Sequence, residues 1–104
     1  MDELLNKSLL FDFYGELLTG YQKDIYEEFV FDDLSLAELA EKHGITRQAV
    51  FNIVKRCERK LVNYEEKLHL VEKFVIIREN AEKIYEISRD DDVRKLAGNI
   101  VDIY

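Results

Sequence analysis

The chain has 104 residues, a formal net charge of −7 and no proline, and 47% of its residues are hydrophobic. This composition excludes a disordered tail and favours an ordered, mostly helical protein that is long enough to bury a core without disulfides or metal. A single cysteine excludes an internal disulfide, and the lack of a basic leader or a long uncharged apolar run predicts a cytoplasmic protein with no membrane span.

The N-terminal third of the chain predicts two helices. Apolar residues recur every four positions at the start of the chain and predict a helix over residues 2–18. Thr19 and Gln22 then have the spacing of a capping box, in which the hydroxyl accepts a backbone amide and the longer side chain reaches back. A second helix is therefore predicted over residues 20–31.

The segment from Ser35 to Arg56 is typical of a helix-turn-helix. Ser35 and Glu38 form a second capping box, which opens a short helix. Gly44 can adopt the positive φ of a sharp turn, and Thr46 can cap the helix that follows. The second helix of such a unit is usually the one that lies in the DNA major groove. The expected inner face of the unit comprises Leu36, Leu39, Ile45, Val50 and Ile53.

The apolar pattern after Thr46 predicts one long helix that ends near Ile87. Apolar residues over positions 50–75 alternate in spacing between four and three, which is an a/d heptad seam. This helix could pack on its own domain or pair with another chain, and a break near Asn63 would remove the distinction. The residues of the candidate dimer seam are Leu61, Tyr64, Leu68, Val71 and Val75.

These elements predict an all-α helix-turn-helix bundle with a long helix after the turn and a C-terminal helix over residues 91–103. We expect a helix-turn-helix domain over residues 1–62. Residues 63–104 would form a helical extension, a candidate dimerising part of the same single domain.

Charge is distributed unevenly along the chain. Residues 35–60 carry six Lys or Arg residues against three acids, whereas residues 1–34 carry two against nine and residues 61–104 carry seven against ten. The helix-turn-helix is therefore the only net-positive segment, and a polyanion can approach the protein only there.

The helix after the turn carries the candidate binding residues. Arg47 and Gln48 have the bidentate geometry that reads guanine and adenine, and the basic residues further along suit phosphates or an acidic partner. The same residues could instead form an ordinary solvated face. The complete candidate face is Thr46, Arg47, Gln48, Phe51, Asn52, Lys55, Arg56, Arg59 and Lys60.

Catalytic and metal-binding patterns are missing from the sequence. The two histidines, His43 and His69, have no Cys or second His at a ligand spacing. No Gly-rich phosphate loop or nucleophile motif is present. We therefore expect a protein that is not an enzyme and needs no cofactor.

Four segments together resemble the YlxM-like family of small helix-turn-helix proteins of Gram-positive bacteria and mollicutes. They are residues 10–22, 35–40, 46–51 and 64–69. The resemblance implies a fold similar to region 4 of bacterial sigma factors and a role in the signal recognition particle pathway, because the family's genes lie beside that of the particle's GTPase. It also implies a recognition-helix face made of Thr46, Arg47, Gln48, Phe51 and Asn52.

Three functions follow as hypotheses. The first is a regulatory protein that binds the RNA or the GTPase of the signal recognition particle through its helix-turn-helix. The second is a sequence-specific DNA-binding transcriptional regulator, dimeric through the seam. The third is a protein-binding adaptor that retains the helix-turn-helix as a scaffold.

Overall fold

The computed structural model describes residues 3–103, with side chains from Asn6 onward, and these residues form six α-helices, one 3₁₀ turn and no strand. The predicted all-α class is confirmed. The chain divides into two compact units, the first ending at Leu68 and the second beginning at His69, whereas the sequence predicted a boundary after residue 62.

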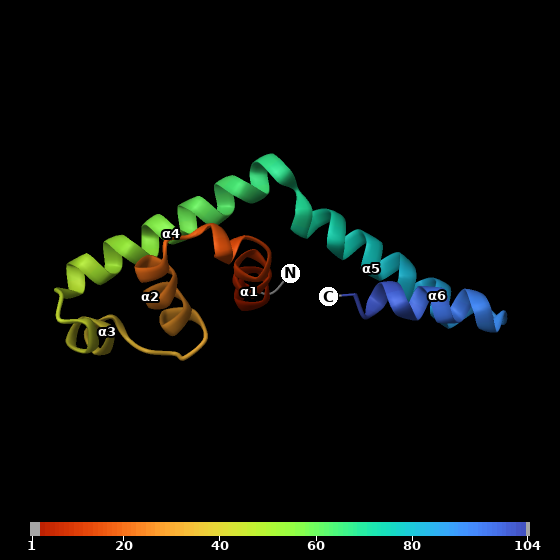
Figure 1. Cartoon of the computed structure of the whole chain (residues 1–104), viewed down its shortest axis with the longest axis horizontal. Coiled ribbons are helices and arrows are strands. Elements are labelled where there is room, and N and C mark those ends of the chain that lie inside the picture. The colour runs from red at the N-terminus through yellow and green to blue at the C-terminus, as the bar shows by residue number, and fades with distance from the viewer. Residues whose placement is uncertain (1–2, 104) are drawn as a thin grey trace. The chain divides into compact units, whose positions relative to one another are not determined.

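The first unit is a bundle of four helices. These are α1 (Glu3–Tyr14), α2 (Gly20–Val30), α3 (Leu36–His43) and α4 (Arg47–Leu68). Figure 1 shows α1, α2 and α3 on the same side of α4, which therefore forms the spine of the unit. The apolar side chains buried among them are Leu10, Tyr14, Leu18, Ile25, Tyr26, Leu39, Ala40, Val50, Val54, Cys57 and Leu61.

The first helix is shorter than predicted. It ends at Tyr14, and a 3₁₀ turn over Gly15–Leu17 replaces the last predicted turn. Glycine weakens an α-helix because its backbone loses the most freedom on ordering. A side chain at Gly15 would also meet the Phe11 ring, since its Cβ would lie 3.1 Å from the ring carbons.

The predicted capping box at the start of α2 is wrong, although the helix begins at the predicted residue. Thr19 makes no side-chain capping hydrogen bond. Gln22 is engaged elsewhere, because its Oε1 accepts a hydrogen bond from Lys60 Nζ of α4 at 3.3 Å. A contact between distant parts of the chain has therefore replaced the local one.

A long helix does follow Thr46, but the apolar pattern does not continue as one helix to Ile87, because the break left open near Asn63 occurs six residues later. His69 adopts a left-handed backbone conformation, φ 57° and ψ 27°, and separates α4 from α5 (Leu70–Ile87). Histidine is one of the few non-glycine residues enriched in this conformation. Its Nδ1 lies 3.3 Å from Glu72 Oε2, and its carbonyl accepts the Lys73 amide at 3.0 Å as α5 begins.

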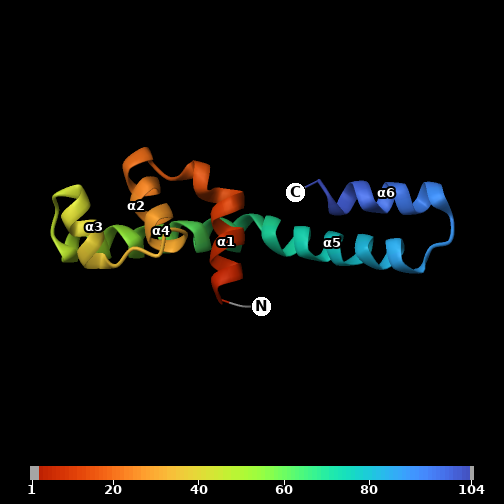
Figure 2. The ribbon, with the colours of Figure 1, turned by 90° about the horizontal axis from the view of Figure 1, so that it is seen from below.

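The second unit is an antiparallel hairpin of α5 and α6 (Asp91–Val101), seen face-on in Figure 2. The predicted last helix begins where expected and is two residues shorter. Asp90 caps it, because its Oδ1 accepts the Asp92 and Val93 amides at 2.9 and 3.2 Å. Within the described residues, no helix is both long and apolar enough to cross a membrane.

Candidate nucleic-acid interface

Local hydrogen bonds set the position of α4 relative to α3. Ser35 Oγ accepts the Glu38 amide at 3.0 Å while Glu38 Oε1 accepts the Ser35 amide at 3.1 Å, so the predicted capping box is confirmed. Gly44 is left-handed, with φ 67°, as the turn requires. Thr46 Oγ1 accepts the Ala49 amide at 3.0 Å, which confirms the predicted cap of α4.

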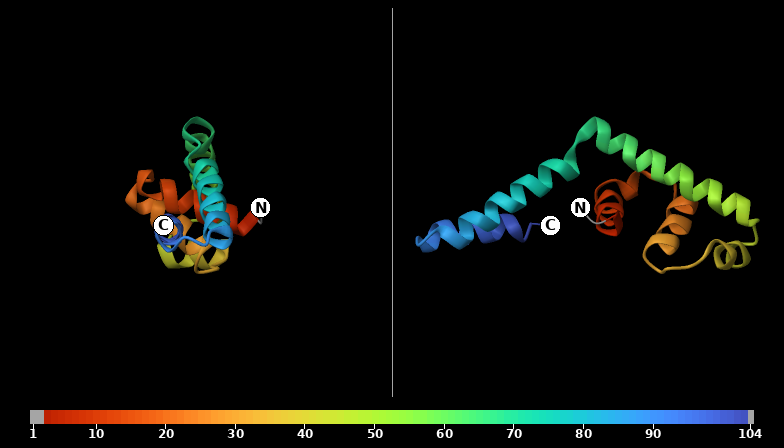
Figure 3. Two further views of the ribbon diagram at one scale, coloured as in Figure 1. Left: turned by 90° about the vertical axis from the view of Figure 1, so that its right-hand side faces the viewer. Right: turned by 180° about the vertical axis from the view of Figure 1, so that it is seen from behind.

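The inner face of the helix-turn-helix packs the two helices together. Leu39 and Val50 are fully buried, and Leu36, Ile45 and Ile53 are half-buried. The Ile45 amide also donates to the Ala40 carbonyl at 3.1 Å, which closes the turn. The start of α4 is therefore packed against α3, and no other described helix of the first unit covers its opposite side (Figure 3, right).

Eight of the nine residues predicted to form the binding face are exposed. Only Lys60 is half-buried, since its ammonium group is hydrogen-bonded to Gln22. The exposed residues are Thr46, Arg47, Gln48, Phe51, Asn52, Lys55, Arg56 and Arg59.

Polar side chains near the start of α4 interact with one another. Gln48 Nε2 donates to Asn52 Oδ1 at 3.0 Å across one helical turn. Lys55 Nζ lies 5.6 Å from the centre of the Phe51 ring, a cation–π contact, and 3.5 Å from Glu58 Oε2. The ring therefore presents an exposed aromatic surface beside a positive charge.

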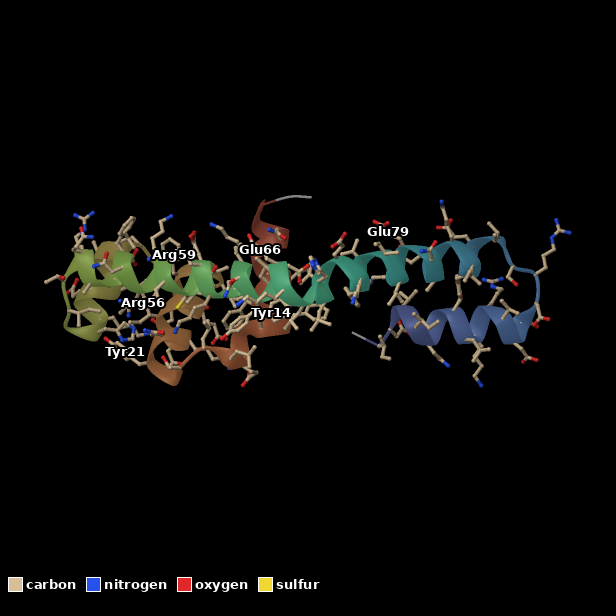
Figure 4. The ribbon with its side chains drawn as sticks, turned by 90° about the horizontal axis from the view of Figure 1, so that it is seen from above. Tyr14, Tyr21, Arg56, Arg59, Glu66 and Glu79 are labelled. Atoms are coloured by element: carbon tan, nitrogen blue, oxygen red, sulfur yellow. The ribbon has the colours of Figure 1, made fainter. Side chains whose placement is uncertain are left out.

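Three exposed arginines of α4 carry positive charge that no described neighbouring acid compensates. Arg47, Arg56 and Arg59 have no carboxylate within 4.0 Å among the side chains that the structure describes. Figure 4 shows Arg56 and Arg59 on the surface of α4, with Tyr21 of α2 beyond Arg56. Arg59 Nε donates to the Lys55 carbonyl at 3.5 Å, and the other guanidinium N–H groups of these arginines are available to an anionic ligand.

Two acids of the first unit, Glu28 on α2 and Glu58 on α4, are paired with local cations. Glu28 Oε2 lies 3.2 Å from Lys42 Nζ and 3.1 Å from His43 Nε2, and its hydrogen bonds to His43 and then Lys42 lower the pKa of its carboxyl group. Glu58 lies 3.8 Å from Lys7 and 3.5 Å from Lys55. These contacts reduce the repulsion that Glu28 and Glu58 exert on a polyanion.

A shallow cleft of about 750 Å³ follows the outer face of α4. Phe51 and Val62 place exposed apolar surface in it, 41% and 45% exposed. Sequence reasoning missed Val62, although it lies three helical turns after Phe51 and so shares its face. The described side chains that line the cleft are Phe51, Asn52, Lys55, Arg56, Glu58, Arg59, Val62, Asn63 and Glu66.

The residues of the predicted dimer seam are divided between the two units. Leu61 is fully buried in the first unit, and the Tyr64 ring packs 5.9 Å from the ring of Tyr14, so neither side chain is directed freely outward. Leu68, 47% exposed, precedes the break, whereas Val71 is buried and Val75 half-buried after it. A continuous seam is therefore absent, and the role of these residues in a dimer stays a prediction.

No group of three or more His, Cys, Asp or Glu side chains in the described part of the chain could hold a metal ion. Burial raises the pKa of the Cys57 thiol, which contacts the Gln22 carbonyl at 3.7 Å. That thiol belongs to the core and lies on the opposite side of α4 from the cleft.

Comparisons with known proteins agree with this description. Residues 1–100 match the model of the UPF0122 family, described as "Putative helix-turn-helix protein, YlxM / p13 like". The chain is similar to a UPF0122 protein of Clostridium kluyveri, 46% identical over 83% of this chain and 78% of that protein. It is 51% identical to a UPF0122 protein of Desulforamulus reducens, over 71% of this chain and 63% of that protein. It is also 35% identical to a UPF0122 protein of Shouchella clausii, over 98% of this chain and 94% of that protein.

Proposed function

The chain belongs to the UPF0122 family of YlxM/p13-like helix-turn-helix proteins, and on this premise we propose that it is a non-enzymatic, cytoplasmic regulatory protein of the signal recognition particle pathway. It binds the RNA or the GTPase of the particle through the exposed face of α4. The observation that carries binding of an anionic partner is the set of arginines Arg47, Arg56 and Arg59, which no described carboxylate neutralises.

The chemistry of this face favours the RNA. Phe51 is 41% exposed and lies beside Lys55, which suits stacking of an unpaired base with a phosphate close by. Gln48 and Asn52, one turn apart, offer amide groups to the edge of such a base. A protein with a net charge of −7 binds RNA through this face alone, so binding is moderate in strength and weakens with salt.

The test is fluorescence anisotropy of the purified protein with the particle's RNA, its GTPase and mixed duplex DNA. The variant Arg56→Gln/Arg59→Gln removes two charges from the face. Its control, Lys83→Gln/Lys95→Gln, removes two exposed charges from the second unit at the same net charge. The face variant should weaken RNA binding and reduce the slope of log affinity against log salt by about 1.4, since each phosphate contact contributes about 0.7 for single strands.

Equal losses in the two variants would contradict a localised RNA site. Saturable binding to the GTPase without binding to RNA would assign the face to a protein partner. Binding to neither component would remove the pathway from consideration and leave the adaptor hypothesis.

A second candidate function is sequence-specific recognition of duplex DNA. The observation that favours it is the exposed first turn of α4 after a tight turn, which places Arg47 and Gln48 where a recognition helix contacts base edges. Arg47→Ala should then cost about 1–3 kcal/mol at one base position and relax specificity there. A uniform effect on all DNA sequences would contradict this function.

A further inference from the structure

The hairpin of α5 and α6 leaves much of its apolar surface exposed. Ile77 and Ile84 on α5 are 55% and 42% exposed, and Leu96 and Ile100 on α6 are 64% and 41% exposed. Among the described side chains of these two helices, only Val71, Ala81 and Ala97 are buried, and the small Ala81 and Ala97 mark where α5 and α6 meet.

The exposed residues of α5 are displaced to one side of its contact with α6. At about 100° per residue, Ile77 and Ile84 lie about 40–60° from Ala81, which marks the contact. Their spacing of seven residues keeps them in line along the helix.

The exposed residues of α6 are displaced in the same rotational sense. Val93, Leu96 and Ile100 lie about 40–100° from Ala97, which marks the contact on this helix. Because α5 and α6 run antiparallel (Figure 2), equal displacements bring both sets to the same side of the hairpin, here called the hairpin face. Its residues are Ile77, Ile84, Val93, Leu96 and Ile100.

We propose that the hairpin face pairs with the same face of a second copy of this chain about a two-fold axis, forming a four-helix bundle. Spacings of seven on α5 and of three and four on α6 are those of helices that pack on helices. The identical face of another copy supplies the matching apolar helices, and a two-fold arrangement closes without leaving a face unpaired.

The charge of the second unit agrees with self-association. Residues 69–104 carry six Lys or Arg residues against eight acids, so two copies repel each other only weakly. The small negative charge disfavours a nucleic acid or an anionic membrane as the occupant of the face. An apolar protein surface remains as the partner.

The size of the face is sufficient for a dimer of moderate affinity. An 18-residue helix is about 27 Å long and an 11-residue helix about 16 Å, and neighbouring axes lie about 8–10 Å apart. The face therefore covers roughly 500 Å² per copy, and a pair buries about 1,000 Å², where specific interfaces begin. We expect dissociation in the micromolar range.

Sedimentation equilibrium of the full chain between about 1 and 100 μM tests this pairing, with helicity measured by circular dichroism for each variant. Ile77→Lys and Leu96→Lys should each raise the dissociation constant by at least tenfold, because each places two charges in the interface. Ile76→Lys is the matched control, since Ile76 is 51% exposed and about 140° from Ala81, on the far side of α5.

A chain that stays monomeric at 100 μM would overturn the proposal, as would an equal loss in the Ile76→Lys control. Leu68→Lys tests the predicted seam separately, because Leu68 is 47% exposed and lies outside the hairpin face. Dissociation by Leu68→Lys but not by Ile77→Lys would assign the dimer to the seam and would also overturn the proposal. None of these outcomes depends on RNA binding, so the two proposals fail independently.

Discussion

The contact between Tyr14 and Glu65 fastens α1 to α4, and its removal has a calculable effect. The Tyr14 hydroxyl donates to Glu65 Oε1 at 2.6 Å, while its ring is 1% exposed and packs 5.9 Å from the ring of Tyr64. Tyr14→Phe keeps the buried ring and removes only the hydroxyl. It therefore isolates the hydrogen bond from the packing.

Hydrogen bonds to charged groups contribute about 1.5–3 kcal/mol to stability. Glu65 is half-buried and regains water when the hydroxyl is lost, so the lower end of this range applies. We expect Tyr14→Phe to reduce the free energy of unfolding by about 1.5 kcal/mol, which corresponds to a decrease of about 6–12 °C in Tm for a domain of this size.

Urea unfolding followed by circular dichroism measures this loss, with Tyr21→Phe as the control. The Tyr21 ring is 51% exposed and stands edge-on to His43, and the variant should change stability by less than about 0.5 kcal/mol. A Tyr14→Phe protein as stable as the wild type, or an equal loss in Tyr21→Phe, would refute the reasoning. Because the contact lies far along α4 from Thr46, RNA binding by the folded variant should be unchanged.

Three further predictions concern the first unit. Gly44→Ala should lower the free energy of urea unfolding by about 1 kcal/mol. The cause is backbone strain alone, because φ is 67° and nothing lies within 4 Å of the added Cβ. An unchanged free energy of unfolding would contradict a left-handed turn. His43 and Lys42 lower the pKa of the Glu28 carboxyl, so the ionised carboxylate stabilises the folded protein. This stabilisation is present above the ordinary pKa of 4.5 and is lost as pH falls through the lowered value. The urea midpoint should accordingly fall more between pH 6 and pH 3 in the wild type than in Glu28→Gln, and parallel falls would count against the contact. The Cys57 thiol is fully buried and its pKa is raised, so a thiol reagent should label it only as fast as the first unit opens, and faster labelling of the native protein would disprove that burial.

Sequence patterns that act within a few residues predicted the helix-turn-helix well. The Ser35 and Glu38 capping box, the left-handed Gly44 and the Thr46 cap each depend on backbone groups at most a turn away, so the residues that make them lie together in the chain. The exposed face of α4 follows from the same logic, because a helix with a buried stripe must present its other residues to solvent.

Features that depend on distant residues were not predictable in this way. Gln22 had the spacing for a local cap, but its side chain accepts a hydrogen bond from Lys60 of α4 instead. No local sequence pattern indicates that α2 and α4 pack together at this point. Leu61 fits a heptad seam as well as a core position, and only the packing of the first unit decides between them.

The sequence by itself determined the helical class, the turn and its caps, and the side of α4 that carries its charge. Only the tertiary structure decided where α4 ends, because His69 bears no glycine or proline signal and its left-handed backbone costs about 1–2 kcal/mol against a straight helix. Local helix propensities contribute tenths of a kcal/mol per residue to stability and determine where helices form. Burial of a whole side chain contributes several times more. Which faces are buried, and which remain open to a partner, is therefore set by contacts between helices.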